Sequence, residues 1–145
     1  MKATRWAACI AGLWAGVLLG VGLIGAPAGF ATGLREAAGL AAGRMFAQEA
    51  FLSLALAVVM CLLLRQRLPA PRQVQPGSAF SIDLMLALGA LFCTVAGYFA
   101  LQPMMAAARA GEGALSFGAL HALSAGFYGV KTALVVALAW RLTAR

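Results

Sequence analysis

Four long apolar stretches follow one another along the chain, separated by short segments that hold most of the charged residues and prolines. The stretches cover about residues 6–26, 45–64, 82–105 and 117–140. Each can cross a bilayer as a helix, because about 20 apolar residues rising ~1.5 Å each span the hydrocarbon core. The pattern predicts an all-α integral membrane protein, with residues 1–145 forming one four-helix, up-down transmembrane bundle.

The first stretch resembles a secretory signal but is expected to be retained as a helix. Lys2 and Arg5 form a basic amino end, and Ala26-Pro27-Ala28 resembles a cleavage site. The apolar run is nevertheless longer than the roughly 7–15 residues of a signal. Small residues also recur on one helix face, where a second helix can approach closely; these are Ala8, Gly12, Gly16 and Gly20. We therefore expect a retained helix that supports a homo-oligomer.

The segments between the stretches predict the helix boundaries. Pro27 is expected to kink or end the first helix, because proline lacks a backbone donor. Residues 28–44 are rich in Ala and indicate a helical extension or a short interfacial helix. The proline-rich residues 65–80 are expected to form an extended loop. Ser81 and Ser116 are expected to be the N-caps of the third and fourth helices.

Composition excludes a soluble domain. The chain is 63% hydrophobic and 10% charged, with a mean hydropathy of +0.93, whereas soluble domains are about 25% charged. The net charge of +7 lies mostly in short flanks between apolar runs, which is typical of membrane topology and suits anionic lipid headgroups. The expected partner is the lipid bilayer, and nucleic acid is not expected.

The basic residues also predict the orientation. One side would carry Lys2, Arg5, Arg65, Arg67, Arg72, Arg141 and Arg145, and the other Arg35, Arg44 and Arg109. Because basic residues concentrate on the cytoplasmic side, both termini and the proline-rich loop are expected in the cytoplasm, at the inner (plasma) membrane.

The fourth stretch carries an unusual polar stripe. His121, Ser124, Tyr128 and Lys131 fall within an arc of roughly 80° on a helix. A lysine near the centre of a membrane helix costs about 2.5–3.5 kcal/mol. We expect Lys131 to point into the bundle, with Tyr128 about one turn above it.

Residue counting predicts the depth of the other polar groups. Glu49, Tyr98 and His121 would each lie about four to seven residues below the outer surface and form one cluster. Lys131 would lie roughly 10–15 Å deeper than Glu49, so a direct salt bridge between them is not expected.

The candidate intramembrane polar site has two interpretations. It comprises Glu49, Tyr98, Gln102, His121, Tyr128 and Lys131. Ionisable groups at this depth commonly line a pathway or a binding site. Polar groups can instead hold helices together, each hydrogen bond contributing about 0.6–2 kcal/mol.

No motif for catalysis or metal binding is present. The chain lacks a phosphate loop, a G-x-S-x-G elbow, and H-x-x-H, C-x-x-C or M-x-x-M spacing. Cys9, Cys61 and Cys93 lie in apolar runs and are expected to be buried, inert thiols. The sequence therefore predicts no metal site, assigns no cofactor or catalytic residue, and favours a protein that is not an enzyme.

Three blocks carry a family resemblance. They are AGRMFAQEAFLSLALAVV around Glu49, GYF-x-L-Q-P at Gly97 to Pro103, and S-F-x-x-L-H at Ser116 to His121. With them the chain resembles a bacterial member of the transmembrane protein 205-like family (domain of unknown function 4149). The resemblance implies a four-helix membrane domain with an acidic residue at Glu49. A more remote similarity is to the copper-resistance D and haem-biosynthesis membrane proteins, but the multiple deep histidines that a haem site would need are absent here.

The pattern leaves three function classes open. The first is a transport or stress-tolerance protein whose polar stripe handles a proton, an ion or a small solute. The second is a non-catalytic scaffold that binds partner proteins through its small-residue faces. The third is a membrane redox or metal-handling protein.

Overall fold

The computed structural model describes residues 2–31, 33–66 and 81–144, and these residues contain helices and no strands. The helical elements are α1 (Lys2–Leu19), η1 (Gly20–Gly25), α2 (Ala26–Ala31), α3 (Arg35–Arg65), α4 (Ile82–Thr94), η3 (Val95–Ala100), α5 (Leu101–Arg109) and α6 (Phe117–Thr143). The two η segments are π-helical turns within longer helices. Most of the predicted proline-rich loop, residues 67–80, lies outside the described residues.

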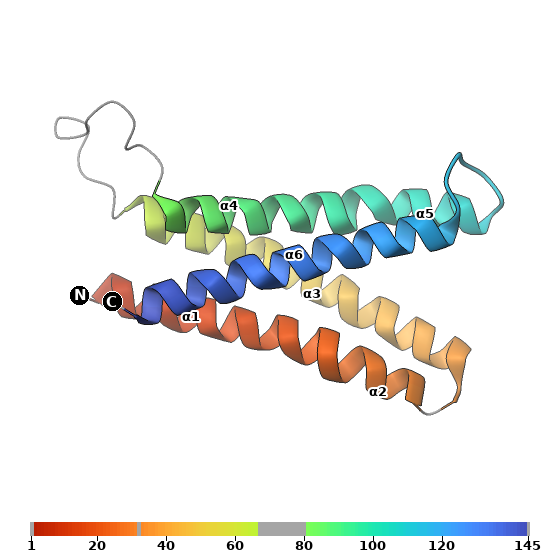
Figure 1. The fold of residues 1–145 in the computed structure, drawn as a ribbon, viewed down its shortest axis with the longest axis horizontal. Coiled ribbons are helices and arrows are strands. Elements are labelled where there is room, and N and C mark those ends of the chain that lie inside the picture. The colour runs from red at the N-terminus through yellow and green to blue at the C-terminus, as the bar shows by residue number, and fades with distance from the viewer. Residues whose placement is uncertain (1, 32, 67–80, 145) are drawn as a thin grey trace.

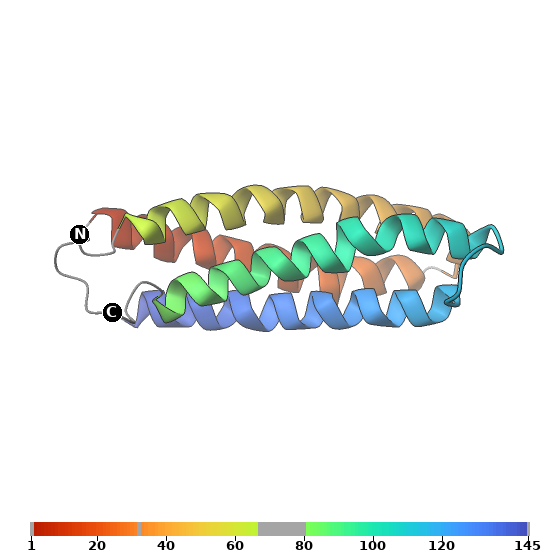
Figure 2. The same ribbon diagram turned by 90° about the horizontal axis from the view of Figure 1, so that it is seen from above.

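Within these residues, four helices are long and apolar enough to cross a membrane. They run over Arg5–Ala31, Arg35–Arg65, Ile82–Arg109 and Phe117–Thr143. Consecutive helices run in opposite directions, and α1 begins at the same end of the bundle where α6 ends (Figures 1 and 2). The all-α prediction with four candidate spans is confirmed.

The predicted N-caps are also confirmed. The Ser81 hydroxyl oxygen accepts from the Leu84 amide, and that of Ser116 accepts from the Ala119 amide, each at 3.2 Å. Each serine satisfies an otherwise unpaired donor in the first turn of its helix. These caps set where α4 and α6 begin.

Each of the long helices packs on two neighbours. The α1 and α4 helices both contact α3 and α6, whereas α3 and α6 make no backbone contact with each other among the described residues. The α3 and α6 helices therefore face each other across the diagonal of the bundle. Any direct link between them must be made by long side chains that cross the bundle axis.

The end of the bundle where α1 begins is closed by apolar packing. One buried cluster joins all four helices there: Ala7, Ala11, Met60, Leu64, Leu84, Ala87, Leu138 and Leu142. A second cluster, which contains Trp14, Leu18, Ala57, Ala90 and Val135, continues it toward the middle. Burial of this apolar surface closes the axis of the bundle in this half.

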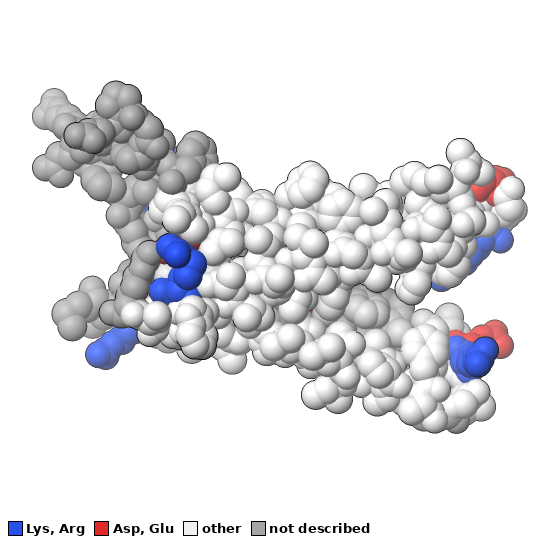
Figure 3. Space-filling model, in the orientation of Figure 1, with Lys and Arg blue, Asp and Glu red and all other residues white. Residues whose placement is uncertain are grey.

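The opposite end is divided into two helical hairpins. The α2 helix packs on α3, and α5 packs on α6 around Leu101, Met105 and Leu120, but no contact joins α2 to α5 or α6 in the described part of the chain. Figure 3 shows the resulting notch between two arms, and the charged side chains visible on this face lie at the two ends of the molecule.

Several predicted helix boundaries differ from the structure, and the third and fourth helices extend to Arg109 and Thr143, past their predicted ends at residues 105 and 140. The α3 helix begins at Arg35, ten residues before the expected start of the second span, because Ala38 and Ala42 bury their methyl groups within the α2–α3 hairpin. Of the two alternatives predicted for Pro27, a kink or an end of the first helix, the end is wrong, because the helix continues to Ala31; the π-helical turn η1 ends at Gly25, two residues before this proline. The α2–α3 hairpin is therefore longer than the apolar pattern alone predicts.

Candidate functional site

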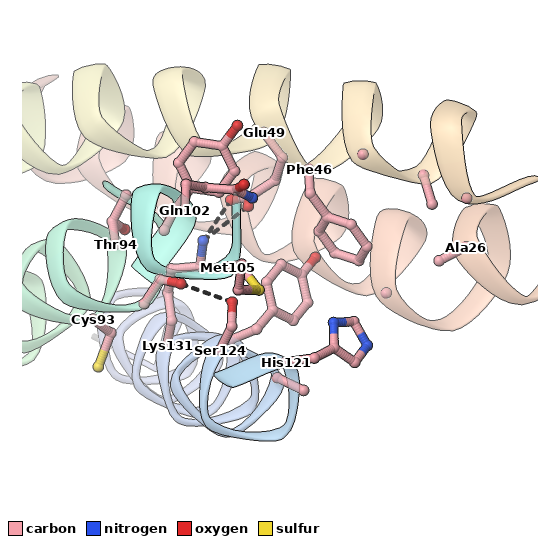
Figure 4. Close-up of a pocket in the computed structure, with 18 of the residues that line it drawn as sticks. Ala26, Phe46, Glu49, Cys93, Thr94, Gln102, Met105, His121, Ser124 and Lys131 are labelled. Atoms are coloured by element: carbon pink, nitrogen blue, oxygen red, sulfur yellow. Dashed lines mark hydrogen bonds and ion pairs between the residues drawn. The ribbon is translucent and has the colours of Figure 1, made fainter. Parts of the chain in front are cut away.

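A buried ion pair crosses the centre of the bundle between α3 and α6. Lys131 Nζ donates to both carboxylate oxygens of Glu49, at 2.8 and 2.9 Å, and the two residues are 3% and 4% exposed. Figure 4 shows the ammonium group directed at the carboxylate. The prediction that Lys131 points into the bundle is confirmed, and the prediction that no salt bridge joins it to Glu49 is wrong.

The length of α3 explains this error. The apolar pattern predicts that the second span starts at residue 45, whereas α3 begins at Arg35. Glu49 is therefore 14 residues from the start of α3, and Lys131 is likewise 14 residues from the start of α6 at Phe117. At ~1.5 Å per residue both lie about 21 Å along their helices. The two side chains are level, and together they are long enough to cover the diagonal.

The carboxylate of Glu49 is held from a second side. The Ser53 hydroxyl, one turn along α3, donates to Glu49 Oε1, and the Trp14 indole on α1 donates to Ser53 Oγ at 2.8 Å. Both Trp14 and Ser53 are buried. A relay of hydrogen bonds from α1 through α3 to α6 thus orients Glu49, and every group in it has a partner.

Two hydroxyl groups of α6 extend this network to the backbone of the other helices. Tyr128 donates to the Leu18 carbonyl, and Ser124 donates to the Gly97 carbonyl, each at 2.7 Å. Gly97 lies within η3, and Leu18 lies in α1, two residues before η1 begins at Gly20. Such π-helical turns are frequent at functional sites. The Tyr128 ring also lies 4.9 Å from Lys131 Nζ, which is a cation–π distance.

A cleft of about 590 Å³ lies between the two hairpins, and the ion pair forms its floor. Its wall includes small and aromatic residues of α2 and α3, such as Ala26, Phe30, Gly43 and Phe46, and the polar face of α6. The volume falls within the roughly 300–1,000 Å³ of small-molecule sites. The cleft opens away from the end at which α1 begins and α6 ends.

All six residues of the predicted site line this cleft: Glu49, Tyr98, Gln102, His121, Tyr128 and Lys131. The predicted cluster of Glu49, Tyr98 and His121 does not form. His121 is exposed and stacks on Phe117, with ring centroids 5.8 Å apart, and Figure 4 shows it lying away from the ion pair. The cluster was expected because Glu49 was placed too close to the surface. That the cleft is a functional site remains a prediction.

Sequence reasoning missed Trp14 and one further ion pair. Tryptophan usually lies at the membrane interface, so an indole in the middle of an apolar stretch signals a buried donor that needs an acceptor. Asp83 lies in the first turn of α4, and its carboxylate accepts from Arg141 Nε at 2.8 Å. This second pair lies at the closed end, where α4 begins and α6 ends.

The three cysteine thiols differ in their exposure. Cys93 is buried, Cys61 is partly buried and Cys9 is exposed, so the expectation of three buried thiols is wrong for Cys9. Cys9 lies on the outward face of α1, which has no neighbour in the bundle.

Within residues 2–31, 33–66 and 81–144, no group of three His, Cys, Asp or Glu side chains is placed to hold a metal ion.

The fold and the site define a class of protein: a helical bundle with four candidate membrane spans and an ion pair under an open cleft. Residues 9–114 match the family model described as Domain of unknown function (DUF4149), and the chain belongs to this family. The match includes Trp14, Glu49 and Ser53 and ends before α6, which supplies Lys131. No curated protein and no solved structure matches the chain.

Proposed function

We propose that this protein is a multi-pass protein of the inner membrane that binds a small solute or ion in its cleft and moves it across the bilayer. The observation that carries this proposal is the Glu49–Lys131 pair on the bundle axis, with an open cleft on one side and packed apolar side chains on the other. Transport requires a site that opens to one side at a time, and this arrangement has one open half and one closed half.

The ion pair suits the role of a gate. Two buried charges are costly to separate, so the axis stays closed while they are paired. A ligand or a proton that satisfies one of the two groups lowers the cost of separating them. The hydrogen bonds from Trp14 to Ser53 and from Ser53 to Glu49 hold the Glu49 carboxylate in place. Lys131 is therefore the partner whose side chain can move.

For orientation, we propose that the end at which α1 begins and α6 ends faces the cytoplasm and the cleft opens to the outer side. The distribution of basic residues along the sequence supports this orientation. We also propose that the chain is a bacterial member of the transmembrane protein 205-like family. A reporter fused at Gly111, which lies in the turn between α5 and α6, should report the outer side, and one at Arg72 should report the cytoplasm.

A second candidate function is that of a scaffold that assembles with further copies of itself. Gly12 and Gly16 are exposed on α1, and an added Cβ at either position, or at Gly20, would meet no atom within 4 Å. Such a surface allows close approach of another helix. The molecular mass of the protein in detergent tests this proposal, and a monomer would contradict it.

The functional test neutralises the ion pair as a unit. Replacing Glu49 alone or Lys131 alone leaves a buried charge without its partner, so protein abundance would fall for structural reasons. The double variant Glu49→Gln/Lys131→Met removes both charges at similar volume, and the glutamine can still accept from Ser53. We expect the double variant to reach wild-type abundance in the membrane, and we expect its activity to be about tenfold or more below that of the wild-type protein.

Growth of cells that lack the native copy, compared across a panel of salts, acids and toxic solutes, measures this activity after complementation. Glu36→Gln, in the exposed first turn of α3, is the matched control and should complement fully. If the double variant complements as well as the wild-type protein in every condition, the ion pair only holds helices together and the scaffold function is favoured.

A further inference from the structure

The mouth of the cleft carries a positive charge that has no acidic partner. The Arg109 guanidinium carbon lies 4.4 Å from the centroid of the Phe117 ring, and Phe117 in turn stacks on His121. All three residues line the cleft. Among the described residues, the two ion pairs are Lys131–Glu49 and Arg141–Asp83, so no carboxylate lies within 4.0 Å of the Arg109 guanidinium. A guanidinium held in this way can bind a carboxylate or a phosphate through two parallel hydrogen bonds.

Below this mouth the wall of the cleft is apolar on the side of α2 and α3. It is formed there by Phe30, Gly39, Ala42, Gly43 and Phe46. An added Cβ at Gly39 or Gly43 would meet no atom within 4 Å, so these glycines leave space in the cleft. A surface of this kind favours a hydrocarbon chain over a hydrophilic solute, because it offers few hydrogen bonds to replace those lost from water.

The charged residues that line the cleft favour a ligand of one charge over the other. Glu49 and Lys131 neutralise each other at the floor, which leaves Arg109 as the unbalanced charge of the lining. Since an amine at the mouth would be repelled by Arg109, a cationic ligand is disfavoured there. An anionic group can remain at the mouth while an attached chain lies between the hairpins.

We propose that the cleft binds an anionic amphiphile, an acyl chain that carries one carboxylate or phosphate group. The anionic group pairs with Arg109, and the chain lies along the wall formed by Gly39, Ala42 and Gly43 toward the ion pair. This inference rests on the proposed function, since it names the class of solute for the same cleft. The ligand can be a free fatty acid or a phospholipid of the surrounding bilayer, because both have this chemistry.

Titration of the full chain in detergent micelles, followed by native mass spectrometry, tests the inference. The probes are oleate, oleyl alcohol and oleylamine, which share one chain and differ in the charge of the head. We expect one oleate per chain, bound about tenfold or more tightly than the other two, which corresponds to one charge-assisted hydrogen-bonded contact. Competition by phosphatidylglycerol, but not by phosphatidylcholine, would identify a phospholipid as the ligand, and its absence would identify a fatty acid.

Two matched pairs of variants locate the site. Arg109→Gln should remove the preference for oleate, whereas Arg35→Gln, in the first turn of α3, should not. Gly43→Leu should block the cleft and weaken binding of all the probes at least about tenfold. Gly126→Leu should leave binding unchanged, because Gly126 also has open space around it but does not line the cleft.

The outcomes separate this inference from the proposed function. If oleylamine binds as tightly as oleate, or if Arg35→Gln acts as strongly as Arg109→Gln, the anionic class is wrong. If Gly43→Leu still blocks every probe in that case, the cleft remains a binding site for another solute. If Gly43→Leu changes the binding of no probe, the cleft does not bind amphiphiles and this inference is wrong, whereas the proposed function is still decided by complementation with the Glu49→Gln/Lys131→Met variant.

Discussion

Replacing Lys131 with methionine should lower the free energy of unfolding by about 3–5 kcal/mol, the usual effect of leaving one buried charge without its partner. The Glu49 carboxylate would keep the hydrogen bond from Ser53 but lose both donations from Lys131. It lies on the bundle axis at 4% exposure, where little water can replace the ammonium group. Unfolding in mixed micelles titrated with SDS, followed by tryptophan fluorescence, measures this loss.

The double variant Glu49→Gln/Lys131→Met should recover most of that stability. Neutral replacements of a buried pair are often no less stable than the pair itself, because the cost of burying two charges disappears with them. Arg44→Met, an exposed arginine on α3, is the control and should change the free energy of unfolding by no more than about 0.5 kcal/mol. If the double variant instead loses the sum of the losses measured for Glu49→Gln and Lys131→Met singly, the two charges are not energetically coupled.

The comparison between the buried ion pair and neutral side chains at the same positions bears on the function of the pair. A bundle that needed only stability could place apolar residues at both positions, since neutral packing is commonly as stable as a buried ion pair. Stability alone therefore does not account for the pair, and its position beneath the cleft agrees with the gate proposed above. Asp83 and Arg141 form a second link at the closed end, where Arg141 is 36% exposed, so separating that pair costs less.

The apolar pattern of the sequence was sufficient to predict the fold. Four runs of about 20 residues leave few alternatives to a helical membrane bundle, because the backbone must satisfy its own hydrogen bonds in lipid. The serine caps at Ser81 and Ser116 were predictable for a similarly local reason, since a cap depends on a few consecutive residues. Predictions from such local rules are correct when alternative local structures are much less stable.

The site was harder to predict, because it depends on where α3 begins. Residues 35–44 contain arginine and glycine, so hydropathy assigned them to the segment outside the second span. Their helical state was predicted from their alanine content, but whether they continue the second span or form a separate interfacial helix was left open; α3 is continuous from Arg35 and packs against α2, a tertiary contact that a sequence pattern does not contain. The ten-residue error in the start of the helix changed the depth of Glu49 by about 15 Å. The residues of the site were therefore predicted, but their pairing was not.

The close contact between η3 and α6 predicts that a substitution at Gly97 causes a large loss of stability. An added Cβ at Gly97 would lie 2.4 Å from Phe127 Cβ, and neither atom can move without its backbone. Gly97→Ala should therefore push η3 away from α6 and weaken the hydrogen bond that Ser124 donates to the Gly97 carbonyl. Because an overpacked core typically loses about 1–3 kcal/mol, we expect a loss of that size in the same SDS titration.

Gly126→Ala supplies the matched comparison for this prediction. Gly126 lies on α6, where an added Cβ would meet no atom within 4 Å. Alanine is favoured over glycine inside a helix by about 0.5–1 kcal/mol, so this variant should be as stable as the wild-type protein or slightly more stable. If Gly97→Ala is as stable as Gly126→Ala, η3 and α6 are not in close contact at this level. The bundle would then be looser around the cleft than the structure indicates, and the Ser124 hydrogen bond could not hold η3 beside the ion pair.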